Sequence, residues 1–128
     1  MAVHALSVSA ARRTALRVLQ RVRRDEAFAG AVLAGNLASG TLGAEDTALA
    51  TRLVYGVLSA EGVLDEAIDR HLARQAEPRV RDVLRLAAFE LLFSRAPAYA
   101  VVDQAVELTR GIRPQAAGLA NAVVRRVA

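Results

Sequence analysis

Apolar residues recur at intervals of three and four along most of this chain, and this spacing restricts it to packed helices. A helix places such residues on one face, whereas a strand needs apolar residues at alternate positions. The composition agrees, because 54% of the residues are hydrophobic and only 4% are aromatic, with Ala, Leu, Val and Arg abundant. We therefore expect an all-α fold of about seven helices without a strand.

Caps and breakers set the expected ends of these helices. The helix expected to begin at Pro78 has almost no polar face, so it should be the central and most buried helix. Gly56 lies inside a helix, where glycine costs stability, and so indicates a close helix crossing. The expected helices run from a cap at Ser9 to Arg24, from Ala27 to Leu37, from about Glu45 to a break at Glu61-Gly62, from Leu64 to Leu72, from Pro78 to Leu92, from Tyr99 to a stop at Gly111, and from Gln115 to Val127.

A chain of 128 residues suits one domain, or two small subdomains that share a core. Residues 1–10 are expected to form a flexible segment and residues 11–128 the domain. The first ten residues are too short and mixed for a secretory signal, and no apolar run approaches the ~20 residues needed to cross a bilayer. The expected location is the cytoplasm, without membrane contact. The absence of cysteine excludes disulfides and thiolate zinc sites and agrees with a reducing compartment.

Arginines are concentrated near the beginning of the chain. At helical pitch Arg13, Arg17, Arg21 and Arg24 share one face, opposite a stripe of core residues. A row of guanidinium groups suits phosphates, so the predicted partner is RNA, although a solvated helix face would have the same pattern. Arg12 and Arg23 project sideways between the two faces, so the sequence allows RNA contact and packing against other helices equally for these two side chains. The candidate RNA-binding residues are Arg12, Arg13, Arg17, Arg21 and Arg24.

Acidic residues gather elsewhere, between Thr41 and Asp69, against the single base Arg52 before residue 70. This predicts a molecule with one basic and one acidic face. The pair Asp65 and Asp69 has the spacing of neighbours on a helix, and we interpret it as part of a solvated face.

The sequence does not favour catalysis by this chain. It has no Gly-x-Gly-x-x-Gly loop and no lysine for a phosphate-binding motif. Its two histidines, His4 and His71, are far apart in sequence and no cysteine could join them, so a zinc site is not expected and His71 is interpreted as structural. We predict a binding module with no catalytic residue, no metal site and no cofactor of its own.

Four ordered motifs, which together cover most of the chain, closely resemble the NusB-like family. Each motif is weak alone, but their order makes the resemblance specific. The motifs are Arg52-Leu-Val-Tyr-Gly-Val-Leu58, Val83-Leu-Arg-Leu-Ala-Ala-Phe-Glu-Leu-Leu92, Ala96-Pro-Ala-Tyr-Ala-Val-Val-Asp-Gln-Ala-Val-Glu-Leu108 and Leu119-Ala-Asn-Ala-Val-Val-Arg-Arg126.

The resemblance implies two helical subdomains packed at a steep angle and one of two functions. One branch of the family is the transcription antitermination factor, which binds boxA RNA with ribosomal protein S10. The other is the N-terminal RNA-binding domain of the RsmB methyltransferases, which modify cytosine C5 of 16S ribosomal RNA. The ending Asn121-Ala-Val-Val-Arg-Arg126 favours the second branch, since antitermination factors more usually have Asn-Gly-Val-Leu-Asp there, and Asp103-Gln104 likewise departs from their common Asn-Glu.

The methyltransferase branch implies further partners and roles. Such enzymes use paired cysteines and S-adenosylmethionine in a later domain, so this cysteine-free chain is expected to be a domain of a longer enzyme. It would dock ribosomal RNA, methylate nothing and contact the C-terminal methyltransferase domain of the same enzyme. A third possibility is a purely helical scaffold whose basic face docks only on that catalytic domain and not on RNA. The family pattern also implies that Asn121 is a buried position that joins helices through hydrogen bonds. Tyr55 and Tyr99 are expected to pack in the core or a turn rather than stack on bases.

Overall fold

We describe residues 8–128 in a computed structural model of the chain. Residues 1–7, with His4 and most of the segment expected to be flexible, lie outside the described residues. The all-α prediction is confirmed, because the described part of the chain forms seven α-helices, one 3-10 turn and no strand. The helices are α1 (Ala10–Asp25), α2 (Ala29–Leu37), α3 (Ala44–Ser59), α4 (Glu61–Asp69), α5 (Pro78–Phe93), α6 (Ala98–Ile112) and α7 (Ala117–Val127), with the 3-10 turn η1 (Pro114–Ala116) before α7.

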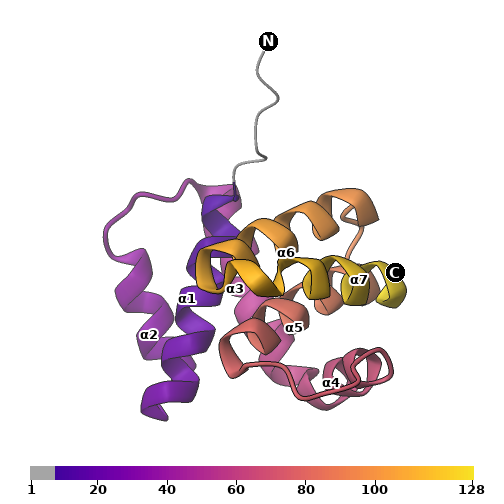
Figure 1. The fold of residues 1–128 in the computed structure, drawn as a ribbon. Helices are drawn as coiled ribbons and strands as arrows, with labels where there is room; N and C mark the ends of the chain where they lie inside the picture. The colour runs from indigo at the N-terminus through magenta and orange to yellow at the C-terminus, as the bar shows by residue number, and fades with distance from the viewer. Residues whose placement is uncertain (1–7) are drawn as a thin grey trace.

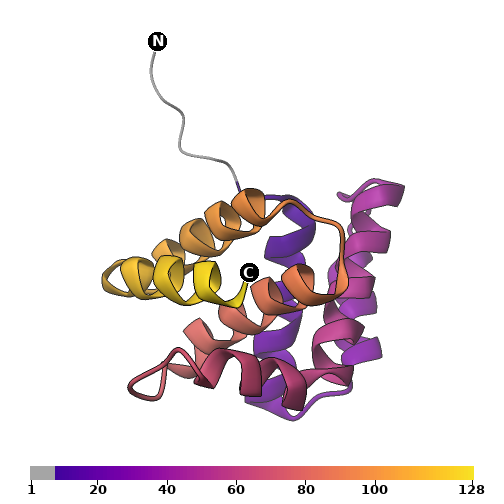
Figure 2. The same cartoon turned by 90° about the vertical axis from the view of Figure 1, so that its right-hand side faces the viewer.

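The helices form two groups that share α5 as their common element. Helices α1, α2 and α3 pack together, α4, α6 and α7 pack on α5, and α5 also contacts α1 and α3. Figures 1 and 2 show α1 upright in both views while α6 and α7 lie across it. This arrangement agrees with the expectation of two small subdomains at a steep angle.

The core lies where the apolar stripes predicted it. Leu19 of α1, Leu53 of α3 and Leu84 of α5 are at most 1% exposed and belong to one continuous cluster. The expectation that α5 is the central helix is confirmed, since every residue from Val80 to Glu90 except Arg85 is buried. Leu92 and Leu119 continue the apolar spacing of their helices and were predicted to be buried, but they lie near helix ends and are 44% and 40% exposed.

Local capping signals act as expected at two helix starts. The Ser9 side chain accepts a hydrogen bond from the backbone nitrogen of Arg12 at 3.1 Å, and Pro78 occupies the first turn of α5. Helix α1 ends one residue later than predicted, where Glu26 adopts a left-handed conformation with φ of 50°. The start of α1 is therefore fixed by its own sequence.

The glycine breaks were predicted less well. Gly62 lies inside α4, and the separation from α3 is the single residue Ala60, so the break expected at Glu61-Gly62 is wrong by one position. Gly111 lies inside α6, which continues to Ile112. A Cβ at either glycine would meet nothing within 4 Å, and at such exposed sites glycine costs some helix stability without ending the helix.

Gly56 confirms the predicted close crossing. A Cβ built at Gly56 would lie 2.2 Å from Cζ of Phe89, so the ring of Phe89 occupies the space that any other residue would need. Through this contact α3 packs closely against the shared helix α5. The glycine is required here for space rather than for backbone freedom.

Among residues 8–128, no helix combines the length and the apolar character needed to cross a membrane.

Candidate nucleic-acid interface

The outer face of α1 displays a row of arginines. Arg13 and Arg17 are exposed, and among the residues described neither side chain forms a hydrogen bond or ion pair. The opposite face of the helix is buried through Ala11, Ala15 and Val18. Two guanidinium groups one helical turn apart are thus available to an external anion.

The row continues to the end of α1 with partial neutralisation. Arg21 and Arg24 are 58% and 73% exposed, and both approach Asp25, at 3.4 Å from Arg21 Nε to Oδ2 and 3.0 Å from Arg24 Nε to Oδ1. Pairs this exposed contribute little to stability, so either arginine can leave Asp25 for a phosphate. The sequence prediction that these four arginines share one face agrees with their exposure, and RNA contact remains a prediction.

Arg12 lies differently, with its guanidinium against α5. Its Nε donates to Glu90 Oε1 at 2.7 Å and its Nη2 to Glu90 Oε2 at 2.6 Å, and the two side chains are only 15% and 4% exposed. Nearby, Gln104 Oε1 accepts a hydrogen bond of 2.8 Å from the backbone nitrogen of Ser9. Of the two roles left open by the sequence, the geometry of Arg12 corresponds to packing between helices.

Arg23, in the last turn of α1, is likewise held by carboxylates of other helices. Its guanidinium bonds to Asp82 of α5 and to Glu61 of α4, and Asp82 is 2% exposed. Burial raises the pKa of Asp82 above its usual value, although Arg23 and Arg85 lie beside it. Asp82 was not predicted as a site residue, because a single aspartate beside Arg81 carries no signal in the sequence that it is buried.

The acidic segment is largely paired rather than free. Arg85 holds Asp65 through two bonds of 2.7 and 2.9 Å, and Arg81 reaches Asp69 at 2.7 Å. Partial burial alone would raise the pKa of Asp65, but these arginines lower it below its ordinary value. The interpretation of this pair as part of a solvated face agrees with Asp69, which is exposed, but is wrong for Asp65, which is partly buried between two arginines. Glu45 and Asp46 at the start of α3 remain exposed, so the acidic face is smaller than predicted.

A pocket of about 480 Å³ adjoins the beginning of α1. Arg52 of α3 and Arg95 of the turn after α5 line it, and both are exposed, with no ion pair to any residue that the structure describes. Phe93 lines it as well and is 55% exposed. Sequence reasoning missed these residues because they lie on separate elements. The only signal was that Arg52 and Arg95 stand at the edges of apolar motifs.

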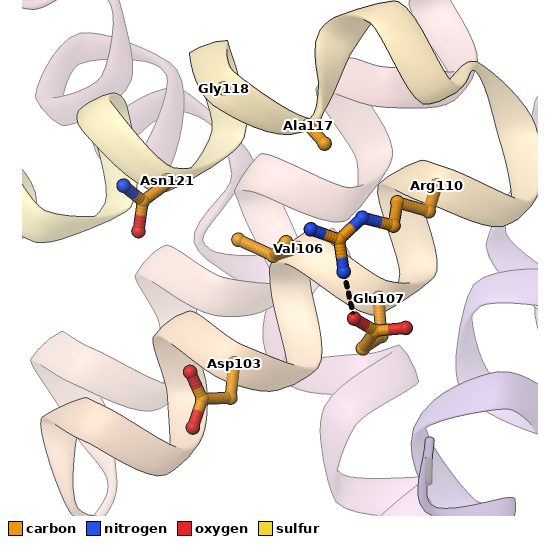
Figure 3. Close-up of a pocket in the computed structure, with 7 residues that line it drawn as sticks. All are labelled: Asp103, Val106, Glu107, Arg110, Ala117, Gly118 and Asn121. Atoms are coloured by element: carbon orange, nitrogen blue, oxygen red, sulfur yellow. Dashed lines mark hydrogen bonds and ion pairs between the residues drawn. The ribbon is translucent and has the colours of Figure 1, made fainter. Parts of the chain in front are cut away.

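A second pocket lies between α6 and α7. Figure 3 shows Asp103, Val106 and Arg110 of α6 facing Ala117 and Asn121 of α7, with the ion pair of Arg110 and Glu107 at one side. Asn121 is half-buried and its side chain makes no hydrogen bond within residues 8–128, so the expectation that it joins helices is wrong. Gln104 of α6 is the amide that connects two elements, through Ser9.

Two further expectations concern single side chains. Tyr55 and Tyr99 are 45% and 74% exposed, so Tyr99 in particular does not pack as expected. His71 is half-buried just after α4, and the described residues contain no group of three or more His, Cys, Asp or Glu side chains that could hold a metal ion.

Comparisons with known proteins give relatives of two kinds. Residues 9–128 match the NusB family. The chain is 38% identical over 123 residues to "Putative methyltransferase MT1451" of Mycobacterium tuberculosis, which covers 92% of this chain and 27% of that protein. It is 44% identical over 85 residues to ribosomal RNA small subunit methyltransferase B of Thermus thermophilus, which covers 65% of this chain and 21% of that enzyme.

A solved structure resembles the whole fold. It is the crystal structure of antitermination factors NusB and NusE in complex with dsRNA, with a TM-score of 0.81 and 25% identity, over 91% of this chain and 92% of the matched one. The chain spans about a quarter of the length of the methyltransferases that it matches and nearly all of this structural relative.

Proposed function

The chain belongs to the NusB family, and on this premise we propose that it is the RNA-docking domain of a 16S ribosomal RNA cytosine-C5 methyltransferase. The exposed arginine row of α1 would hold the phosphates of ribosomal RNA and so position the substrate for a separate catalytic domain. S-adenosylmethionine would bind in that other domain and not here.

The observation that carries the proposal is the difference between two kinds of arginine on one helix. Arg12 and Arg23 are held by carboxylates of α5, whereas Arg13 and Arg17 face outward without a partner in the described chain. Arginines that only stabilised the fold would be paired as the first two are. The unpaired ones fit a polyanionic partner, since guanidinium groups form forked hydrogen bonds with phosphate oxygens.

The relatives favour a methyltransferase as the parent enzyme. The match to the M. tuberculosis protein covers almost the whole chain, and the T. thermophilus relative is by name a ribosomal RNA enzyme. Both relatives are three to five times longer than the matched region, which leaves room for a catalytic domain of their own.

The salt dependence of RNA binding tests the arginine row. If about four arginines each neutralise one phosphate, the log-log slope of the association constant against salt should be near −3 for single-stranded RNA. In the double variant Arg13→Gln/Arg17→Gln, the slope should fall to about −1.5, measured by fluorescence anisotropy with a fragment of 16S ribosomal RNA.

The matched control is Arg125→Gln/Arg126→Gln, which removes the same charge from exposed positions at the end of α7. It should change the slope far less than the α1 variant does. Equal effects of both variants would mean that net charge alone attracts RNA, and a slope near zero in the unaltered protein would overturn the proposal.

A transcription antitermination factor is the second candidate, and the NusB–NusE–dsRNA relative favours it. Such a factor would bind boxA RNA and ribosomal protein S10 cooperatively. We expect no cooperativity: adding S10 should leave the affinity for a boxA oligonucleotide within about twofold, as measured by anisotropy. A tenfold or greater increase, about 1.4 kcal/mol of coupling, would favour the second candidate instead.

A further inference from the structure

The pocket at the beginning of α1 combines positive charge with an exposed aromatic ring. Arg12 of α1 and Leu49 of α3 line it together with Arg52, Phe93 and Arg95. These residues come from three helices and a turn, so the fold alone brings them together. Arg12 lines the pocket, and the next residue of α1, Arg13, begins the outer row without lining the pocket itself.

The charge of this pocket is positive and unused. Its only carboxylate, Glu90, is already bonded through both oxygens to Arg12. Arg52 and Arg95 remain on the walls, each exposed and without a partner in the described residues. Because Arg12 already neutralises Glu90, the two remaining guanidinium groups make the pocket positively charged and favour an anionic ligand.

Phe93 is held in place although more than half of its surface is open. Its ring centre lies 5.6 Å from that of Phe89, with the planes tilted by 31°. Phe89 is buried and lies over Gly56, so it cannot move away without opening the crossing of α3 and α5. An aromatic ring that is supported on one side and exposed on the other is a platform on which a base can stack.

We propose that this pocket holds one unpaired nucleotide of the bound RNA. Its base stacks on Phe93 and its flanking phosphates contact Arg52 and Arg95, while the adjoining nucleotides follow Arg13 and Arg17 along α1. This inference rests on the proposed RNA docking and adds to it a specific subsite for a single-stranded nucleotide.

The test compares Phe93→Leu with Phe93→Tyr on single-stranded RNA oligonucleotides, measured by fluorescence anisotropy. Because stacking on an aromatic ring contributes ~1–3 kcal/mol per base, Phe93→Leu should raise Kd by roughly 5- to 150-fold, and Phe93→Tyr should stay within about twofold. In a series of oligonucleotides that each lack the base at a different position, one member should bind weakly to the unaltered protein. Phe93→Leu should not weaken the binding of that member further, because the stacked base is already missing.

Three further measurements make the test specific. Phe28→Leu removes a ring that is 88% exposed, before α2 and away from the pocket, and should leave Kd unchanged. The two pocket contacts would add to the four of α1 and bring the slope to about −4, and Arg52→Gln and Arg95→Gln should each reduce it by about 0.7. A free nucleoside monophosphate should not displace the oligonucleotide, because it cannot also reach Arg13 and Arg17.

The outcomes separate this inference from the proposed function. If Phe93→Leu binds every oligonucleotide as the unaltered protein does, while Arg13→Gln/Arg17→Gln still weakens binding, the subsite is wrong and RNA docking on α1 stands. If the α1 variant is also without effect, both proposals fail. Unchanged thermal unfolding of Phe93→Leu should show that its effect is on binding and not on folding.

Discussion

Replacing Arg12 by Met is expected to lower the free energy of unfolding by about 3–5 kcal/mol. The variant leaves the carboxylate of Glu90 without its partner, and Glu90 is only 4% exposed. A buried charge that loses its counterion bears the full cost of desolvation, whereas methionine keeps most of the packing of the arginine stem. Urea denaturation followed by circular dichroism measures the loss.

Two comparisons show whether the loss comes from the ion pair. The double variant Arg12→Met/Glu90→Leu removes both charges and should regain most of the stability, because a buried pair can often be replaced by apolar side chains. Arg13→Met changes the next residue, which is exposed, and should alter stability by no more than about 0.5 kcal/mol. If Arg12→Met unfolds like the unaltered protein but binds RNA weakly, Arg12 serves RNA rather than the fold.

The second large effect is expected at the crossing of α3 and α5. Gly56→Ala should carry a packing cost of about 1–3 kcal/mol, since the new methyl group would lie 2.2 Å from Cζ of Phe89 and must displace that ring. This cost should exceed the gain of about 1 kcal/mol that alanine brings to a helix interior, so we expect a net destabilisation of up to about 2 kcal/mol. Thermal unfolding and urea titration measure the net change.

Gly35 provides the matched control, since it also lies inside a helix but a Cβ added there would meet no atom within 4 Å. Gly35→Ala should therefore stabilise the protein by about 0.5–1 kcal/mol. Replacing Phe89 by Leu in the Gly56→Ala background should recover part of the loss by making room. Stabilisation by Gly56→Ala alone would show that the ring of Phe89 moves aside at little cost.

Features that depend on neighbours in sequence were predicted well. The cap at Ser9 and the start of α5 at Pro78 follow from local rules, and Gly56 predicted a close crossing although not its partner Phe89; the structure has all three features. The apolar spacing also predicted which face of α1 is buried. Local rules failed at Gly62 and Gly111, where an exposed glycine weakens a helix without ending it.

The candidate site was predicted only in part, because its details depend on residues far apart in sequence. Helical pitch separates Arg13 from Arg12, but only the fold shows that Glu90, 78 positions later, holds Arg12. The pocket around Phe93 draws Arg52 from one helix and Arg95 from a turn, and no periodicity relates them. Pairwise contacts of this kind require the packed structure.

The ion pairs from α1 to α5 have a consequence for how tightly RNA can be held. Arg12 and Arg23 attach α1 to the rest of the protein close to its two ends, so the backbone between them is already ordered before any ligand arrives. The intervening outward guanidinium groups thus lose only side-chain freedom on association, whereas a disordered basic arm would also lose backbone freedom. Weakening the ion pair of Arg12 or of Arg23 should therefore reduce the affinity for RNA, because the backbone of α1 would then lose freedom on binding. Neither arginine needs to contact a nucleotide for this effect.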